Sequence, residues 1–250
     1  MDGDGADPLP APAVREKAGS EGGHAAPVSI VVPVLDEAQA LPSLLEHLAP
    51  LRDRGCEILL ADGGSRDGSA DLAEQAGFCV VRAPRGRARQ MNAGAHAAHG
   101  DLLLFLHADT RLPADADALV VRALSRADRV WGRFDVAIDG SAAMLRIVAF
   151  LMNRRSRWTG IATGDQAIFV RRAAFDAIGG FPDQALMEDI EASRRLKRIS
   201  PPACIAERVV TSGRRWERVG VWRTILLMWR LRFAYWLGAN PEALAQRYRT

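Results

Sequence analysis

Asp-Leu-Leu-Leu-Phe-Leu-His-Ala-Asp-Thr, residues 101–110, joins a continuous apolar run to two polar side chains. The run at 102–106 has the length and composition of a β-strand buried on both faces. His107 and Asp109 follow it directly, and both are side-chain types that bind metal ions. In an open α/β sheet, ligands bind at the carboxyl ends of the strands, which is where Asp109 falls. A divalent ion held there by a carboxylate keeps positions open for phosphate oxygens, so the stretch predicts chemistry on a phosphorylated substrate.

The stretch belongs to a chain in which segments of strand and helix length alternate. Strands are predicted at residues 28–34, 56–61, 78–82 and 102–106. Between them, helices are predicted after Asp36, expected as an N-cap, at 69–77 with Ser69 as its cap, and at 88–99. This alternation is typical of right-handed βαβ units and predicts an α/β fold with a mostly parallel sheet. Beyond residue 113 it weakens, with helices expected at 114–125, 142–152 and 188–199 and strands at 129–138 and 166–170.

The composition is ordinary for a globular protein of 250 residues, with 48% hydrophobic and 25% charged residues. Charge is unevenly distributed along the chain. Residues 1–140 contain 14 Lys/Arg and 21 Asp/Glu, whereas residues 141–250 contain 19 and 9, so a net charge of −7 is followed by one of +10. A basic half suits a pyrophosphate ligand or an anionic surface. The arginines are spread over several elements without an aromatic-basic motif, which argues against nucleic acid as a partner.

The cysteines and the amino-terminal segment bear on cellular location. Cys56, Cys79 and Cys204 show neither close pairing nor metal-ligand spacing, and we expect buried thiols in a reducing compartment. Residues 1–26 are rich in Asp, Gly, Ala and Pro and contain no apolar segment of the kind found in secretory signals. They are expected to form a disordered leader. Both observations favour a cytoplasmic protein.

Four loops follow predicted strands, and in a parallel sheet they meet at one edge. The loop at 62–68, Asp-Gly-Gly-Ser-Arg-Asp-Gly, has glycines that let the backbone approach a ligand, and Asp62 is positioned to accept hydrogen bonds from a base or ribose. Its glycine spacing differs from the dinucleotide-binding fingerprint, and an ordinary turn stays the alternative. The loop at 84–92 brings Arg85, Arg87 and Arg89 to a helix start, which suits phosphate binding, with a solvated basic loop as the alternative.

Four motifs occur in order along the chain: Val-Pro-Val-Leu-Asp-Glu, Ala-Asp-Gly-Gly-Ser-Arg-Asp-Gly-Ser, Gly-Arg-Ala-Arg-Gln-Met-Asn-Ala-Gly and Phe-Leu-His-Ala-Asp-Thr. Together they resemble glycosyltransferase family 2, the inverting enzymes of GT-A fold. Thr-Gly-Asp-Gln at 163–166, Glu188-Asp189 and Arg214-Arg215-Trp216 fit the same family. In detail the chain is most similar to the small bacterial branch of radical-SAM/selenodomain-associated glycosyltransferases. The similarity covers about residues 28–218.

The resemblance implies an architecture and an activity. The expected architecture is a GT-A domain at 27–218, with a mostly parallel central sheet flanked by helices, followed by an amphipathic helical segment at 219–250. The implied activity is transfer of a sugar from a UDP- or GDP-linked donor to an acceptor hydroxyl, with Mn²⁺ or Mg²⁺ as cofactor.

The resemblance also implies roles for individual residues. On the donor side, it implies that the nucleoside is bound by Pro33, Glu37, Asp62 and Gly64. Arg87 and Gln90 are implied near the sugar or diphosphate, and His107, Ala108 and Asp109 are implied to bind the donor from the end of the fourth strand. Arg215 and Trp216 are implied at the diphosphate or the acceptor. Asp109, together with His107, is implied as metal ligand, and Asp189 as catalytic base. Asp165, Gln166 and Glu188 are expected on the acceptor side.

Three positions depart from the family pattern. Ala61 stands where many relatives have the first of two adjacent acids, so base recognition would rest on Asp62 alone. Asp36 replaces the common Asn before Glu37. His107 replaces the first Asp of the metal motif, and three roles stay open for it: a ligand of a softer ion such as manganese, a donor to a phosphate oxygen, or a group that supports the ligands.

The environment predicted for Asp189 is the start of a helix. There the helix dipole would favour its ionised form, which is the form that accepts a proton. The alternative is that Glu188, Asp189 and Glu191 only complement the helix amino terminus and pair with Arg194 and Arg195.

The segment at 221–237 differs from the rest of the chain. Its apolar face is formed by Trp222, Ile225, Leu226, Trp229, Phe233 and Trp236. Its length and its three arginines argue against a helix that spans a membrane. One interpretation is an interfacial helix at the cytoplasmic face of the membrane. The other is a helix that packs its tryptophans on its own domain or on a second subunit, which would give a homodimer.

Two functional interpretations remain at this stage. The first is a metal-assisted glycosyltransferase, whose acceptor we expect to be lipid-linked because of the apolar segments at 142–152 and 221–237. The second is a catalytically degenerate protein of the same fold that binds a nucleotide or a membrane surface without transfer, as the reduced metal motif would allow.

Overall fold

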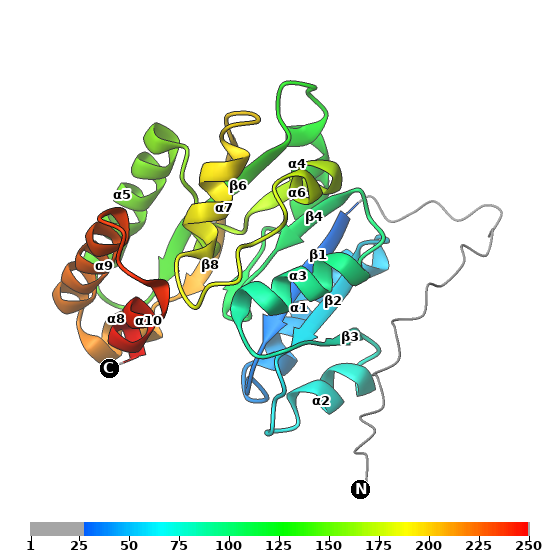
Figure 1. Ribbon diagram of the computed structural model, residues 1–250. Helices are drawn as coiled ribbons and strands as arrows, with labels where there is room; N and C mark the ends of the chain where they lie inside the picture. Colours follow the sequence, from blue (N-terminus) through cyan, green and yellow to red (C-terminus); the bar gives the residue numbers. More distant parts are fainter. Residues whose placement is uncertain (1–27, 250) are drawn as a thin grey trace, which may run out of the picture.

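A computed structural model describes residues 28–249 of the chain (Figure 1). The predicted leader at 1–26 lies outside these described residues. Within them, eight strands form one sheet in the order β3-β2-β1-β4-β7-β6-β8-β5. The strands are β1 (Val28–Val34), β2 (Glu57–Asp62), β3 (Cys79–Arg82), β4 (Leu102–Phe105), β5 (Thr110–Arg111), β6 (Trp131–Asp139), β7 (Phe169–Arg171) and β8 (Ala203–Ser212). The α/β fold with helices flanking the sheet is as predicted.

The helices account for most of the remaining chain. They are α1 (Leu41–Asp53), α2 (Ser69–Gln75), α3 (Arg87–Ala97), α4 (Ala116–Leu124), α5 (Met144–Thr159), α6 (Arg172–Ala177), α7 (Glu188–Leu196), α8 (Arg214–Val219), α9 (Val221–Trp236) and α10 (Pro241–Arg249), with a 3₁₀ turn, η1 (Gly164–Gln166). Elements α6 and α8 and strands β5 and β8 were not predicted, and the helical segment predicted at 219–250 is divided into α9 and α10.

The amino-terminal half of the sheet is parallel. β1 pairs in parallel with both β2 and β4, and β2 pairs in parallel with β3. β1 is formed by a run rich in β-branched residues, and Val28, Ile30, Val31 and Val32 are fully buried within it. Consequently the loops after β1, β2, β3 and β4 share one edge of the sheet, as the alternation predicted.

The carboxyl-terminal half makes the sheet mixed. β7 runs antiparallel to β4 and to β6, whereas β8 runs parallel to β6. Strand β8 escaped prediction because Glu207 and Arg208 interrupt its apolar pattern where both are exposed. The sheet shifts register there, between Phe134 and Asp135 of β6.

Several local predictions were wrong. Asp36 does not cap α1, which begins five residues later, but takes a left-handed backbone with φ of 54°, a conformation for which Asp and Asn are enriched. Ser69 is the first residue of α2, and Gly68 precedes it as the N-cap. Cys79 is exposed at the start of β3, although Cys56 is buried. The strand expected at 166–170 begins only at 169, because Gln166 ends the 3₁₀ turn η1.

The carboxyl-terminal helices lie against the domain. α9 packs beside α5 through Ile225 and Val221, which contact a cluster containing Leu145 and Val148 of α5. Leu231 of α9 and Leu244 of α10 form a second cluster with Met187, just before α7. Glycines with positive φ, Gly220 and Gly238, bound α9 on either side. The C-terminal segment therefore contacts both α5 and the start of α7.

The tryptophans of α9 do not take part in this packing. Trp222, Trp229 and Trp236 are 66%, 71% and 77% exposed. The interpretation in which they pack on the chain's own domain is therefore wrong. Among residues 28–249, no helix has both the length and the apolar content required to cross a bilayer.

Candidate active site

The loops after β1 and β2 are joined by hydrogen bonds. The Arg66 N–H donates to the Asp36 carboxylate at 2.8 Å, and the Glu37 N–H donates to the Ser69 hydroxyl at 2.9 Å. The Ala38 N–H donates to the Asp67 carboxylate at 2.8 Å. The glycine-rich loop is therefore held by neighbouring side chains and is more than an ordinary turn.

Two predicted donor-site residues, Asp62 and Gln90, are engaged within the chain. The Asp62 carboxylate is 1% exposed and accepts the N–H groups of Gly64 at 3.1 Å and Ser65 at 3.2 Å. The Gln90 amide donates to the carbonyls of Val34 at 2.7 Å and Ala61 at 2.8 Å, so it bridges the ends of β1 and β2. A side chain at Gly63 would overlap Gln90. Both residues stabilise the loop after β2 through these hydrogen bonds. Gln90 is too buried to make the contact with the sugar or diphosphate that was expected of it.

Asp109 lies at the rim of a cavity of about 260 Å³, together with Arg214, Ser212 and Asp139. Its negative charge reaches Glu37 in the loop after β1. Burial raises the pKa of Glu37, Asp109 raises it further, and Arg214 opposes them. The loops after β1 and β4 are therefore adjacent, as predicted. The arginine that lines this cavity with Asp109 is Arg214. The family resemblance had instead implied Arg215 as the arginine at the diphosphate or the acceptor.

His107 faces η1 with both ring nitrogens. Its Nδ1 lies 3.4 Å from the Asp165 carboxylate. Its Nε2 is buried and has no hydrogen-bond partner within residues 28–249, and a Cβ added to Gly164 would overlap it. The imidazole therefore fills the space between β4 and η1. This position suits a residue that orients Asp165 better than one that ligates a metal.

Asp189 is the second residue of α7, and its carboxylate is held by backbone donors. The Gly164 N–H donates to Asp189 Oδ2 at 2.8 Å, and the Ile190 N–H donates to Oδ1 at 2.7 Å. Burial, followed by the charge of Glu188, raises the pKa of Asp189 to about 6. We expected the helix dipole to favour ionisation, but desolvation and a like charge outweigh it. The carboxylate titrates just below neutral pH, where a general base is most effective.

Arg87, at the start of α3, connects the donor loops to this acid. Its Nη1 lies 3.5 Å from the Glu188 carboxylate. Burial alone would lower the pKa of Arg87, but Glu188, Asp189 and Asp165 raise it above its ordinary value. The glutamate is 3% exposed and serves as the partner of Arg87. The alternative pairing of Glu191 with Arg194 and Arg195 also holds, at 3.4 and 3.1 Å, on the outer side of the helix.

Two residues expected at the substrate are placed elsewhere. Gln166 is completely buried; its amide lies 3.4 Å from Asn153 and its oxygen accepts the Thr163 N–H. Trp216 packs against the cluster of Leu145 and Val148. Gln166 is therefore too buried for the acceptor contact expected of it, whereas Trp216 is half-buried.

Arg155 of α5 was named only as part of a basic stretch, yet it has an unusual environment. Its Nε and Nη2 atoms are buried and, among the described residues, have no hydrogen-bond partner. Burial lowers the pKa of Arg155 against the opposing charges of Asp189 and Asp165. An unpaired buried guanidinium is costly, so a bound anion would stabilise it.

Tyr248 of α10 is a site residue that the sequence did not indicate. The Arg215 guanidinium stacks on its ring at 3.7 Å and donates to its carbonyl at 2.7 Å. Burial raises the pKa of Tyr248; Arg215 and Arg87 oppose this, and Asp165 and Asp109 add to it. Its phenol therefore lies within electrostatic reach of groups from both halves of the sheet. Asp109 and Asp165 of η1 are thus both near this phenol.

The metal prediction can be tested against these contacts. Within residues 28–249, no three His, Cys, Asp or Glu side chains gather into a metal-binding cluster. The Asp109 carboxylate is exposed and has one long contact, 3.4 Å, to the Thr110 hydroxyl. This fits a divalent ion held by a single carboxylate, with the remaining ligands supplied by substrate phosphates and water.

Comparison with known proteins places this site in a family. A GT-A type α/β fold with acids and arginines at the carboxyl edge of the sheet is typical of glycosyltransferases that use nucleotide sugars. The profile of glycosyl transferase family 2 matches residues 29–179, and the chain belongs to this family.

Curated relatives include two enzymes named undecaprenyl-phosphate 4-deoxy-4-formamido-L-arabinose transferase. The one from Serratia proteamaculans is 32% identical over 160 residues, which cover 58% of this chain and 48% of the relative. The one from Pseudomonas paraeruginosa is 37% identical over 161 residues, which cover 58% and 46%. The chain thus spans about half the length of these relatives.

Solved structures share the fold. Residues 1–349 of TarS from S. aureus in complex with UDP match with a TM-score of 0.60 and 14% identity, covering 74% of this chain and 60% of that one. The mannosyltransferase PcManGT from Pyrobaculum calidifontis, in complex with GDP-Man and Mn²⁺, matches with a TM-score of 0.59 and 18% identity, covering 90% and 69%. These similarities support the GT-A fold.

Proposed function

We propose that the protein is an inverting glycosyltransferase that moves a sugar from a UDP- or GDP-linked donor to an acceptor hydroxyl. The observation that carries this proposal is the environment of Asp189, a carboxylate with a pKa of about 6 held by the Gly164 N–H beside Arg87. The motifs of the small radical-SAM/selenodomain-associated branch support placing the chain there within its family.

In the proposed reaction, the acceptor oxygen attacks the anomeric carbon from the face opposite the nucleoside diphosphate. The bond from that carbon to the diphosphate oxygen breaks as the new bond forms. Asp189 accepts the proton of an acceptor hydroxyl, a contribution of roughly 10²–10⁴-fold in rate.

The departing diphosphate develops negative charge, which positive groups must stabilise. Arg214 lines the same cavity as Asp109, and Arg87 lies at the start of α3 beside Glu188. Asp109 would hold Mn²⁺ or Mg²⁺, which supplies charge neutralisation at the diphosphate when bound. His107 would orient Asp165 and is not proposed as a ligand.

The acceptor is proposed to be lipid-linked and to carry an anionic group beside the attacking hydroxyl, and the protein is proposed to act in the cytoplasm at the inner face of the membrane. Arg155 supports an anionic acceptor, because its buried Nε and Nη2 have no bonded partner among residues 28–249 and burial lowers its pKa despite the charges of Asp189 and Asp165. The names of the curated relatives, which contain undecaprenyl phosphate, support the same acceptor class.

A thermal-shift panel of nucleoside diphosphates with and without Mn²⁺, followed by a transfer assay, tests the proposal. We expect the nucleoside diphosphate of one base to raise the Tm more with Mn²⁺ than without it. Asp109→Asn should remove the additional increase in Tm caused by Mn²⁺ while the protein stays folded. Arg126→Gln, an exposed arginine far along the chain from these loops, is the matched control. If no nucleoside diphosphate shifts the Tm, the degenerate, non-transferring alternative is supported instead.

A further inference from the structure

Helices α5 and α9 expose an unusual amount of apolar surface. On α5, Ile147, Phe150 and Leu151 are 51%, 60% and 57% exposed, and Trp158 is 84% exposed. On α9, the three tryptophans are accompanied by Leu226 and Phe233, both about 60% exposed. Figure 1 shows the two helices next to each other at one end of the molecule. Soluble proteins rarely leave so many large apolar side chains together, and such patches mark interaction surfaces.

The exposed residues follow helical spacing. On α9 they recur at positions 222, 226, 229, 233 and 236, and on α5 at 147, 151, 154 and 158, where position 154 is an arginine. Each series forms one stripe along its helix. Thr224 and Leu231 form the buried side of α9, and Val221 and Ile225 beside its stripe pack against a cluster that contains Leu145 and Val148 of α5. Below, "the aromatic face" means these two stripes together with Phe150.

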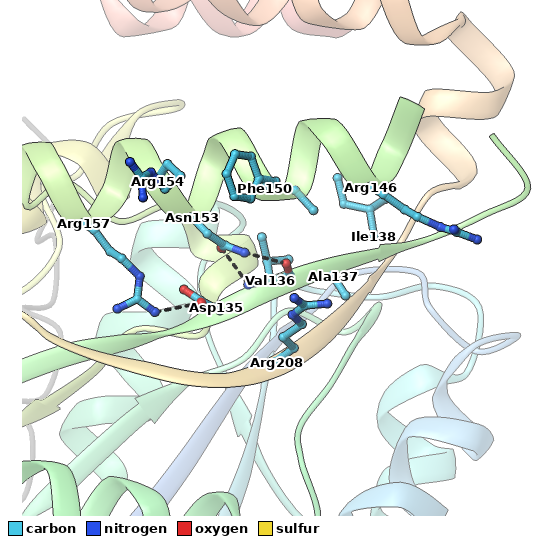
Figure 2. Close-up of a pocket in the computed structure, with 11 residues that line it drawn as sticks. Asp135, Val136, Ala137, Ile138, Arg146, Phe150, Asn153, Arg154, Arg157 and Arg208 are labelled. Atoms are coloured by element: carbon cyan, nitrogen blue, oxygen red, sulfur yellow. Dashed lines mark hydrogen bonds and ion pairs between the residues drawn. The ribbon is translucent and has the colours of Figure 1, made fainter. Parts of the chain in front are cut away.

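A cavity of about 390 Å³ opens beside the α5 stripe, between this helix and strands β6 and β8. Figure 2 shows Arg154, Arg157 and Arg146 on α5 and Arg208 on β8 around it, with Phe150 at its edge. Asp135 is the acid in its lining and is paired with Arg157 at 2.8 Å and with the buried Arg133.

The other arginines of the cavity have no acidic partner. Among the described residues, no ion pair involves Arg146, Arg154 or Arg208; Arg154 lies near the rings of Phe150 and Trp158, at 6.0 and 5.8 Å. The cavity thus carries an excess of positive charge beside exposed aromatic rings. This combination complements an anionic group attached to an apolar body.

We propose that the aromatic face is a docking surface for an anionic phospholipid bilayer, and that the arginine-lined cavity binds a lipid phosphate headgroup. Aromatic side chains prefer the headgroup level of a bilayer, and neighbouring arginines interact with anionic lipids. The inference rests on the proposed membrane location of the enzyme, and it adds a second helix, α5, and a specific headgroup site.

Charge favours a bilayer over a second copy of the chain. Arg223 and Arg230 flank the stripe on α9, as Arg146 and Arg154 do on α5. In a two-fold symmetric contact between two such faces, each face would meet an identical one. The arginines of one copy would then approach those of the other with no acids between them, whereas anionic headgroups neutralise them.

Vesicle flotation of the full chain tests the proposal. Vesicles of phosphatidylcholine alone are compared with vesicles that also contain phosphatidylglycerol, and we expect binding only to the second. Replacing Arg146, Arg154 and Arg208 by Gln should weaken that binding by about fivefold per arginine. Replacing Trp222 and Trp229 by Ser should weaken it without removing its dependence on phosphatidylglycerol.

The controls separate this inference from the proposed function. Arg126→Gln, an exposed arginine away from both helices, should bind vesicles like the unchanged protein. Nucleoside diphosphate binding, measured by thermal shift without vesicles, should be the same in all variants. Equal binding to both vesicle types, or loss of binding in Arg126→Gln, would overturn the headgroup site. A dimer in solution that is abolished by Trp222→Ser and Trp229→Ser, with no vesicle binding, would show that a second copy covers the face.

Discussion

Tyr248 covers Arg215, with the guanidinium 3.7 Å from the centre of the tyrosine ring and hydrogen-bonded to the tyrosine carbonyl at 2.7 Å. The contact joins α10 to α8 across 33 residues of sequence. The charges of Asp109, Asp165 and Arg87 also reach the phenol, so α10 lies near the candidate active site.

Removing the ring should loosen this helix. In Tyr248→Ala we expect hydrogen–deuterium exchange over residues 241–249 to increase, because a partly buried cation–π contact contributes on the order of 1 kcal/mol. Tyr248→Phe keeps the ring and is the matched control, expected to exchange like the unchanged protein. If the Phe variant exchanges as fast as the Ala variant, the stacking on Arg215 is not what holds α10.

The pKa of Asp189 predicts a pH profile. Because the base must be ionised, kcat/KM should rise about tenfold per pH unit below pH 6 and level off above it. Asp189→Asn should lower kcat by roughly 10²–10⁴-fold and abolish this limb. Initial rates between pH 5 and 8 at saturating metal check the prediction, and a profile that stays flat through pH 6 would contradict it.

The same shift predicts that Asp189 destabilises the folded protein. Its pKa is 3.8 when unfolded and about 6 when folded, so the folded state binds the proton more tightly and stability falls as pH rises from about 4 to 6. The cost persists above pH 6. Asp189→Asn should therefore be more stable than the unchanged protein at pH 8, by on the order of 1–3 kcal/mol, and the difference should vanish near pH 4. Urea unfolding at the two pH values measures it.

The contact between Gly164 and His107 predicts a coupled pair. Gly164→Ala would place a methyl group against the imidazole, at a cost of typically 1–3 kcal/mol in unfolding free energy. His107→Ala should relieve most of this cost, so the double variant should be more stable than the sum of the single variants predicts. Simple additivity would mean that the two residues are not in contact.

The sequence specified the parallel half of the sheet because its strands are buried on both faces. The continuous apolar run of β1 leaves no other interpretation, and the loops that follow it therefore converge as expected. Strand β8 lies near the sheet's end, where exposed residues such as Glu207 break the pattern. Periodicity reports burial, so it fails where a strand is only half covered.

The site was predictable in its acids and less so in its supporting residues. Asp109 and Asp189 follow from motif position. The burial of Gln90 and Gln166, in contrast, depends on carbonyls and side chains distant in sequence, and no local pattern encodes it. Tyr248 was the hardest residue to predict, since its position depends on the path of the chain through α9 and α10.

The exposed tryptophan stripe and the covered arginine are thus close neighbours along the chain. Trp236 ends α9, Gly238 makes a left-handed bend, and the nine-residue helix α10 then carries Tyr248 onto Arg215. Helix α9 has a left-handed glycine at each end, Gly220 and Gly238, and the second of them leads into the helix that covers Arg215. A partner bound to the exposed rings of α9 would therefore hold the segment that positions Tyr248.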